Sequence, residues 1–197
     1  YLYKKNPDGA NEIINKLSQK YFGHIDELYA TEEYKEKARE LVTFHFDHIR
    51  SFTKDLFTLF EEKVVLAQGE LISTGMMNLY LQEQGVNSVL LPALDFMRTD
   101  KNAEPDPVYI KEKLNRLLEE NAGADLYITQ GYICRNAYGE IDNLQRGGSD
   151  YTASLIGAAI KAEEIQIWTD IDGMHNNDPR FVKGTSPVRH LHFEEAA

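Results

Sequence analysis

Cysteine and basic residues are scarce in this sequence of 197 residues. Cys134 is the one cysteine, so the chain can form neither an internal disulfide nor a metal site built from several cysteines. Lysine and arginine number 21 against 32 aspartates and glutamates, which gives a formal net charge of −11. A surface that binds nucleic acid or anionic lipid needs a dense array of cations. We therefore expect no nucleic acid and no membrane as partners, although a few placed cations can still hold an anionic substrate.

Long apolar runs are also missing. The longest, at residues 64–67 and 89–94, are far shorter than the roughly 20 residues that a membrane-spanning helix needs. No signal-peptide pattern opens the chain. These observations predict a soluble, cytoplasmic protein, and a hydrophobic content of 42% is enough for a folded core.

Residues 1–63 have the spacing of helices. Apolar residues recur every three or four positions over residues 10–21, with Gly23 as the expected stop, and again from residue 34 to about residue 60 with a break. We interpret this segment as a helical portion that accompanies the rest of the domain.

The pattern changes at Val64, where apolar runs typical of buried strands begin to alternate with helical segments. The expected strands are residues 64–67, 87–91, 126–129 and 164–169, with a hairpin over 132–142, and the expected helices are residues 69–82, 107–120 and 149–162. Such alternation predicts parallel β-α-β units with helices on both faces. We therefore expect an α/β fold, a three-layer α-β-α sandwich with a mainly parallel sheet, formed by residues 64–197.

Ligands of open α/β sheets gather at the carboxyl ends of the strands, and three of the expected loops there carry polar groups. The first loop follows residues 64–67 and contains Gly69 and Glu70. The carboxylate of Glu70 can hold an ammonium group at the mouth of the sheet. The alternative, which spacing alone favours, is that Glu70 only stabilises the positive end of its helix.

The second loop contains Arg146-Gly147-Gly148-Ser149-Asp150. Paired glycines before a helix let backbone N–H groups converge on an anion, and the planar guanidinium of Arg146 suits a carboxylate or a phosphate. Ser149 is the expected N-cap of the helix. A glycine turn with ordinary capping is the plainer alternative, and the spacing matches neither a Walker A loop nor a dinucleotide-binding fingerprint.

The third loop spans residues 167–180. Thr169 and Asp170 stand at the end of an expected strand, where a hydroxyl and a carboxylate can meet a nucleotide or its metal ion. Arg180 follows an Asp-Pro turn and can reach a phosphate. A solvated polar turn is the alternative, and the ligand spacing of an EF-hand is missing.

Histidines give little sign of a metal site. His45 and His48 are three residues apart on an expected helix, and His190 and His192 alternate on an expected strand. Neither pair has an evident third ligand nearby, so we predict no protein metal site and assign these side chains to packing and surface. Cys134 is expected to be a buried thiol.

Taken together and in this order, the loops resemble the aspartate kinase branch of the amino acid kinase family. The matching segments are Gln68-Gly69-Glu70-Leu71-Ile72-Ser73, Met97-Arg98-Thr99-Asp100, Ala103-Glu104-Pro105-Asp106, Thr129-Gln130-Gly131-Tyr132, Arg146 to Thr152, Trp168-Thr169-Asp170, Asp178-Pro179-Arg180 and Phe193-Glu194-Glu195-Ala196. The resemblance implies the amino acid kinase fold. It also implies transfer of the γ-phosphate of ATP to the β-carboxylate of L-aspartate, the entry to lysine, threonine and methionine synthesis, with Mg²⁺ as the accompanying ion.

The roles of individual residues come from the resemblance alone. Glu70 would hold the ammonium group of aspartate and Arg146 its α-carboxylate, and Asp150 would organise the cationic centre between the reacting groups as the catalytic residue. The other implied substrate contacts are Gly147, Gly148 and Ser149. The implied ATP contacts are Gly131, Thr169, Asp170, His175 and Arg180.

Two positions depart slightly from the family pattern, because Gln145 stands where Gly is usual and His175 where Tyr is common. A larger departure is that the family opens with a strand ending in Lys-Phe-Gly-Gly-Thr-Ser, which supplies a catalytic lysine, and continues into a Gly-Ala-Lys segment and regulatory domains. We therefore interpret the chain as a fragment of a catalytic domain. We expect it to be inactive alone, to associate through an unpaired sheet edge, and to form a homo-oligomer as the full-length protein. Another amino acid kinase and a non-catalytic ligand-binding fragment remain the alternatives.

Overall fold

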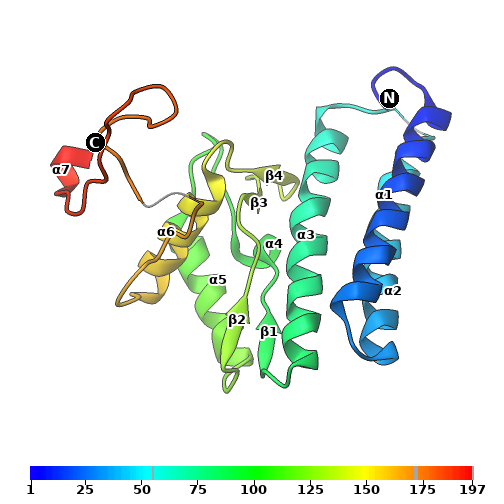
Figure 1. Cartoon of the computed structure of the whole chain (residues 1–197), viewed down its shortest axis with the longest axis horizontal. Coiled ribbons are helices and arrows are strands. Elements are labelled where there is room, and N and C mark those ends of the chain that lie inside the picture. The colour runs from blue at the N-terminus through cyan, green and yellow to red at the C-terminus, as the bar shows by residue number, and fades with distance from the viewer. Residues whose placement is uncertain (55, 171–172, 197) are drawn as a thin grey trace. The chain divides into compact units, whose positions relative to one another are not determined.

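Residues 1–54, 56–170 and 173–196 are described by a computed structural model of the chain (Figure 1). The chain divides into two compact units, Tyr1–Ile165 and Gln166–Ala197. The boundary between the predicted helical portion, residues 1–63, and the predicted α/β portion, residues 64–197, falls inside helix α3 (Leu59–Glu83).

The first helix, α1 (Pro7–Leu28), is longer than the sequence pattern predicted. Asn6 caps it, because its side chain accepts a hydrogen bond from the backbone N–H of Gly9 at 2.9 Å, and Pro7 provides a fitting first residue. The helix continues past Gly23, the expected stop. Its last turn is held instead by Ile25, which is fully buried, and the buried Tyr29 follows directly.

Helix α2 (Glu32–Ser51) packs against α1 and α3, and the predicted break separates it from α3. These three helices enclose a core of their own. Its buried members are Ile14, Ile25, Tyr29, Ala38, Val42, Phe46, Ile72 and Met76.

Helix α3 replaces the strand that was predicted at residues 64–67 and the loop that was predicted after it. The helix begins with a capping box, in which Thr58 and Glu61 bond reciprocally to each other's backbone and side chain. Ala67 belongs to the core around the sheet, whereas Ile72 and Met76 belong to the core with α1 and α2. Because α3 is buried on two sides, its apolar residues surround it, and a short stretch of them looks like a buried strand.

Two small sheets follow α3. Strands β1 (Ser88–Leu90) and β2 (Leu126–Ile128) are parallel, with Val89 opposite Tyr127. Strands β3 (Ile133–Arg135) and β4 (Ile141–Asn143) are antiparallel and form the predicted hairpin. The predicted strands at residues 87–91 and 126–129 are thereby confirmed.

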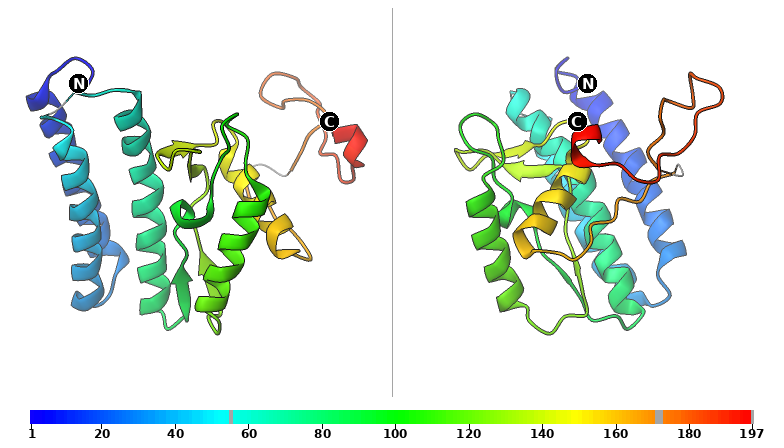
Figure 2. Two further views of the ribbon diagram at one scale, coloured as in Figure 1. Left: turned by 180° about the vertical axis from the view of Figure 1, so that it is seen from behind. Right: turned by 90° about the vertical axis from the view of Figure 1, so that its left-hand side faces the viewer.

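The remaining helices of the first unit are α4 (Ala93–Phe96), α5 (Pro107–Glu120) and α6 (Gly148–Ile160). Helix α3 covers one face of the β1–β2 sheet and α5 and α6 cover the other, while α1 and α2 lie outside α3 (Figures 1 and 2). The predicted α/β fold with helices on both faces and a helical N-terminal portion is confirmed. In the described residues, the parallel sheet has two strands, β1 and β2. The buried core around it comprises Ala67, Leu91, Ala93, Phe96, Met97, Ile110, Leu114, Ile133, Cys134 and Ala159.

The second unit contains little regular structure. The strand predicted at residues 164–169 is wrong, because the described residues there are exposed and outside any ladder. Residues 174–176 approach residues 186–188, with a bridge between His175 and Pro187, and a short helix α7 (Phe193–Ala196) ends the unit. His190 and His192 lie outside a strand, contrary to the prediction, and residues 171 and 172 of the third predicted loop are outside the described residues.

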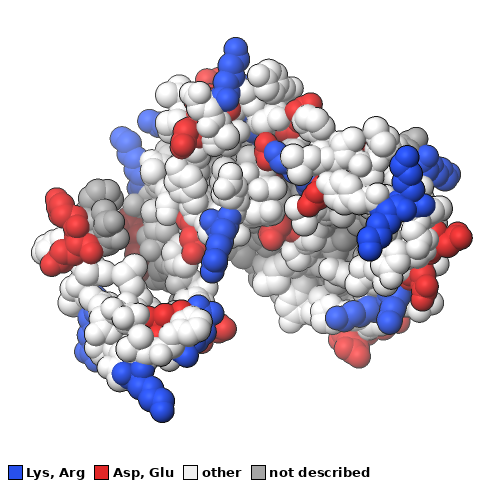
Figure 3. All heavy atoms as spheres, turned by 90° about the horizontal axis from the view of Figure 1, so that it is seen from above, with Lys and Arg blue, Asp and Glu red and all other residues white. Residues whose placement is uncertain are grey.

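The described helices include none with the length and apolar character required to span a bilayer. On the face shown in Figure 3, acidic and basic side chains are interspersed over the surface.

Candidate active site

Glu70 lies in the middle of α3, and not in a loop at the end of a strand as predicted. It is half-buried, and Thr74, one helical turn later, donates its hydroxyl hydrogen to the backbone carbonyl of Glu70 at 2.7 Å. The helix dipole explanation for this carboxylate therefore does not apply, because Glu70 is far from either end of α3.

Gly131 follows β2 and lies directly against the first turn of α6. A Cβ atom on Gly131 would come within 2.9 Å of Cα and Cβ of Ser149, so only glycine allows this approach. Thr152 of α6 also links the segment after β2 to the start of α6. Its hydroxyl accepts the N–H of Tyr132 at 3.2 Å and donates to the carbonyl of Gly148 at 2.7 Å. The predicted Gly131 and Ser149 are thus brought together at the carboxyl end of β2.

The N-terminus of α6 is open to a ligand. Gly147 is its N-cap, with a left-handed φ of 76°, and no side chain caps the helix. Ser149 is therefore in the first turn, and the prediction that it is the N-cap is wrong. The first N–H groups of a helix have no partner inside it, so those at Ser149 and Asp150 suit an anion.

Three predicted charged side chains are unpaired. Among the described residues, nothing forms a hydrogen bond or ion pair with the side chains of Glu70, Arg146 or Asp150. Arg146 and Asp150 are exposed beside the N-terminus of α6. Other charges of the same unit are paired, such as Lys63 with Asp142 at 2.7 Å.

Gln130 and Thr74, for which no role was predicted, connect the backbone of Glu70 to the segment that follows β2. Gln130 is 1% exposed, and its Nε2 donates to the hydroxyl of Thr74 at 2.7 Å. Its Oε1 accepts the N–H of Ala93 at 2.8 Å. Gln130 was noticed only as part of a motif, and Thr74 gave no sequence signal.

A polar cavity of about 370 Å³ adjoins the loop that carries Arg146. The ion pair of Lys63 and Asp142 forms part of its wall, and Tyr151 of α6 forms another part. Ala103 and Gln145, which also line it, have φ values of 63° and 60°, in the left-handed region that favours glycine. Such backbone strain is concentrated at functional sites. Gln145 is the position where the resembling family usually has Gly.

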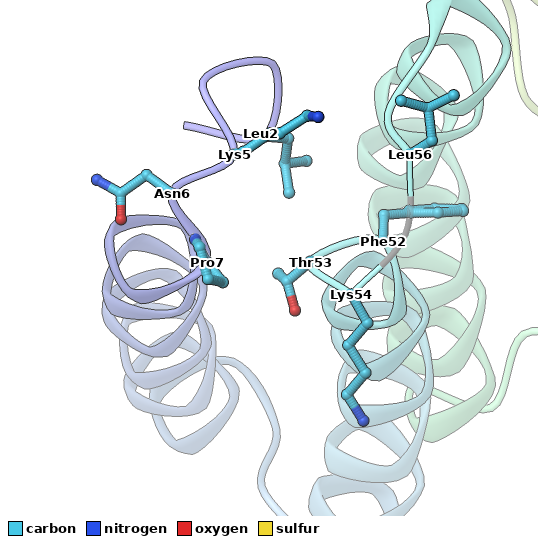
Figure 4. Close-up of a pocket in the computed structure, with 8 residues that line it drawn as sticks. All are labelled: Leu2, Lys5, Asn6, Pro7, Phe52, Thr53, Lys54 and Leu56. Atoms are coloured by element: carbon cyan, nitrogen blue, oxygen red, sulfur yellow. The ribbon is translucent and has the colours of Figure 1, made fainter.

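A second cavity, of about 380 Å³, lies between the turn that precedes α1 and the end of α2 (Figure 4). Its lining residues are Leu2, Lys5, Asn6, Pro7, Phe52, Thr53, Lys54 and Leu56. The predicted site residues are not among them. Glu70 lies in the middle of α3, away in the sequence from the residues that line this cavity, and the cavity is therefore not part of the candidate site.

The other predicted nucleotide contacts are in the second unit. The guanidinium of Arg180 binds the carboxylate of Asp178 at 2.7 Å and 3.1 Å, and this hydrogen bond lowers the pKa of Asp178. The hydroxyl of Thr169 lies 3.2 Å from Asp170, and Nδ1 of His175 lies 3.3 Å from the hydroxyl of Thr185.

His45 and Cys134 are buried and belong to the packing of the fold. Nδ1 of His45 donates to Oε1 of Gln68 at 2.7 Å, which joins α2 to α3. Burial raises the pKa of the Cys134 thiol to about 12, so this sulfur is unreactive near neutral pH. The described residues contain no group of three or more His, Cys, Asp or Glu that could hold a metal ion.

Comparison with known proteins gives consistent matches. The sequence profile of the amino acid kinase family matches residues 9–197. Lysine-sensitive aspartokinase 3 of Escherichia coli is 36% identical over 136 residues, which are 68% of this chain and 30% of that protein. An aspartokinase of Chlamydia trachomatis is 33% identical over 171 residues, 82% of this chain and 38% of that protein. The chain thus spans about a third of the length of these relatives.

A solved structure has a similar fold. Escherichia coli aspartokinase III, in complex with aspartate and ADP, superposes with a TM-score of 0.78 and 26% identity. The match covers 95% of this chain and 43% of that one. The same enzyme in complex with lysine and aspartate superposes with a TM-score of 0.75.

Proposed function

Because this chain belongs to the amino acid kinase family, we propose that it is part of the catalytic domain of an aspartokinase. The reaction is transfer of the γ-phosphate of ATP to the β-carboxylate of L-aspartate, which yields 4-phospho-L-aspartate at the start of lysine, threonine and methionine synthesis. The observation that carries the proposal is the meeting of Gly131 with Ser149 beside unpaired charges of opposite sign, in a chain whose similar proteins are aspartokinases.

The amino acid is held by its two charged groups. The carboxylate of Glu70 binds the ammonium group, and the guanidinium of Arg146 binds the α-carboxylate with two parallel hydrogen bonds. Gly147 and Ser149 provide backbone N–H groups, and Ser149 also a hydroxyl, at the start of α6, whereas the N–H of Gly148 donates to the carbonyl of Gln145 at 3.1 Å and holds the turn. An acceptor held by its ammonium group and its α-carboxylate presents its β-carboxylate in one orientation. Such positioning is the main contribution of a protein to phosphoryl transfer.

In the first unit, Gly131 is the proposed phosphate contact. In the second unit, the proposed nucleotide contacts are Thr169, Asp170, His175 and Arg180. Gly131 lies against Ser149 in the first turn of α6, where backbone N–H groups suit a phosphate, and the guanidinium of Arg180 is paired with Asp178. Mg²⁺ is usually held by phosphates and one or two carboxylates, and the unpaired carboxylate of Asp150 fits that requirement. An ion bound by Asp150 would neutralise charge that builds up between the two anionic reactants.

An assay that traps acyl phosphate with hydroxylamine tests the proposal. It is run with ATP, Mg²⁺ and L-aspartate on the purified chain and on the full-length native protein, with L-glutamate and other acceptors in parallel. We expect aspartate turnover by the full-length protein and little by the chain. Turnover of another acceptor alone would identify a different amino acid kinase. Binding of Mg-ATP without any turnover would indicate a non-catalytic ligand-binding protein.

Replacement of Arg146 tests the assignment of the α-carboxylate. In the full-length protein, Arg146→Gln should raise the KM for aspartate at least about tenfold, because a charge-assisted bidentate contact is lost, and leave the KM for ATP within about twofold. Arg116→Gln is the matched control, since Arg116 is an exposed arginine that pairs with Glu120 within α5. Equal effects of the two substitutions would contradict the role of Arg146.

A further inference from the structure

The helix that carries Glu70 and the strand end that carries Gly131 are separate elements, and a side-chain bridge joins them. The amide of Gln130 is oriented without ambiguity, because the N–H of Ala93 can only donate to its Oε1 at 2.8 Å. Its Nε2 therefore donates to the hydroxyl of Thr74 at 2.7 Å, and that hydroxyl in turn donates to the carbonyl of Glu70 at 2.7 Å. Every hydrogen bond in this chain of groups has a fixed direction.

The bridge is buried at Gln130 and Ala93 and part-buried at Thr74. Gln130 is 1% exposed and Ala93 is fully buried, so water has little access to replace a lost partner. Ala93 is the first residue of α4, where no side chain of the preceding Pro92 caps the helix. One glutamine thus holds the start of α4, the Glu70 turn of α3 and the end of β2.

Gln130 is also next to the point where the loop meets α6. Gly131 follows it and contacts Ser149, and the N–H of Tyr132 is held by the hydroxyl of Thr152. A displacement of Gln130 would be passed on to both sides, to the backbone of Glu70 through Thr74 and to Ser149 through Gly131.

We propose that Gln130 is a positioning residue, which through Thr74 fixes the Glu70 turn of α3 relative to Gly131 and Ser149. The expected effect on the KM for aspartate rests on the proposed function, in which Glu70 holds the ammonium group of aspartate. The expected effect on amide hydrogen exchange does not rest on it, because exchange is measured on the protein without substrate.

The test uses substitutions that remove the bridge with little change of volume. Thr74→Val deletes the hydroxyl but keeps the shape and leaves the bond from Ala93 to Gln130, whereas Thr74→Ser keeps the hydroxyl. Gln130→Leu removes the whole bridge. The control is Gln82→Leu, since Nε2 of Gln82 donates to the carbonyl of Ser88 at 3.1 Å and ties the far end of α3 to β1.

Steady-state kinetics of the full-length protein give the first readout. Thr74→Val should raise the KM for aspartate about tenfold, equivalent to about 1.4 kcal/mol, with the KM for ATP within about twofold. Thr74→Ser and Gln82→Leu should stay within about twofold of wild type for aspartate. A purely structural bridge would instead lower stability without this difference between substrates, and a wild-type KM in Thr74→Val would overturn the proposal.

Amide hydrogen exchange without substrate gives the second readout. Thr74→Val and Gln130→Leu should speed exchange at Tyr132, across the bridge from the substitution at residue 74, by about tenfold, while Gln82→Leu leaves it unchanged. If wild type phosphorylates no aspartate, the proposed function fails and the exchange result alone decides the positioning role. Unchanged exchange at Tyr132 in Thr74→Val would overturn it.

Discussion

Gly131, after β2, lies directly against Ser149 in the first turn of α6, and the requirement for glycine at this position is steric. Its backbone is not in the left-handed region, but any Cβ would lie 2.9 Å from Cα and Cβ of Ser149. Because Cα belongs to the backbone of α6 and Cβ is bonded directly to it, rotation of the Ser149 side chain cannot relieve the clash.

We therefore expect Gly131→Ala to lower the free energy of unfolding by about 1 to 3 kcal/mol and to reduce kinase activity of the full-length protein strongly. Gly69→Ala is the matched control, because a Cβ there meets nothing within 4 Å and Gly69 lies inside α3. The control should retain activity and gain up to about 1 kcal/mol of stability. Thermal unfolding and the hydroxylamine assay measure both effects. Full activity in Gly131→Ala would contradict the contact.

Individual residues of the candidate site differ in how strongly the sequence alone points to them. The glycines at positions 131, 147 and 148 and the charges of Glu70 and Arg146 stand out in the sequence. Thr74 and Gln130 do not, because an uncharged side chain inside a helix or after a strand has no distinctive neighbours. Their importance comes from contact across 56 positions of the chain.

Among the elements, α3 shows how burial on two sides changes a sequence pattern. An amphipathic helix has one apolar stripe, and α5 has that stripe and was predicted with its observed bounds, Pro107–Glu120. Helix α3 faces α1 and α2 on one side and the sheet on the other. Its capping box at Thr58 and Glu61 was the local signal that a helix, and not a strand, begins before Val64.

The start of α5 offers a test of electrostatics. Asp106 caps α5 by accepting the N–H of Tyr109 at 3.0 Å, and Arg98 donates to it at 2.6 Å. The hydrogen bond from Arg98, helped by that from Tyr109, lowers the pKa of Asp106 in the folded state. A carboxyl group with a lowered folded pKa stabilises the fold above its unfolded pKa of about 3.9, and this contribution is lost as the pH falls through the folded pKa.

Asp106→Asn keeps a good N-cap but removes the charge that pairs with Arg98. We expect it to be about 1 kcal/mol less stable than wild type at pH 6, because the pair is partly in contact with water, and we expect the difference to shrink below about pH 4. Urea unfolding followed by circular dichroism measures this at several pH values. Asp125→Asn, at an exposed carboxylate, should show no such trend, and a constant difference for Asp106→Asn would refute the ion-pair explanation.

For the whole molecule, the division into two units predicts that the first can fold alone. Both hydrophobic cores are contained in residues 1–165, and the last element that contributes to them is α6. Ile165 also lies over Gly157, since a Cβ on that glycine would meet its side chain.

A chain of residues 1–165 should therefore unfold cooperatively, with a midpoint within about 5 °C of that of residues 1–197. A chain of residues 1–147 lacks α6 with its buried Thr152 and Ala159, and it should lose the cooperative transition. Differential scanning calorimetry compares the three. A large fall in the midpoint for residues 1–165 would show that the second unit contributes to the stability of the first.

The sequence by itself determined what depends on neighbours along the chain: the helix over residues 107–120, the hairpin, the glycine-rich start of α6 and the family that its ordered motifs resemble. The tertiary structure alone decided that residues 64–67 are helical and residues 164–169 are not a strand. A strand exists only where another strand pairs with it, and a helix buried on two sides loses its stripe, so both outcomes depend on residues distant in the sequence. For the same reason only the fold could show that Gln130 reaches Thr74 and that Gly131 meets Ser149.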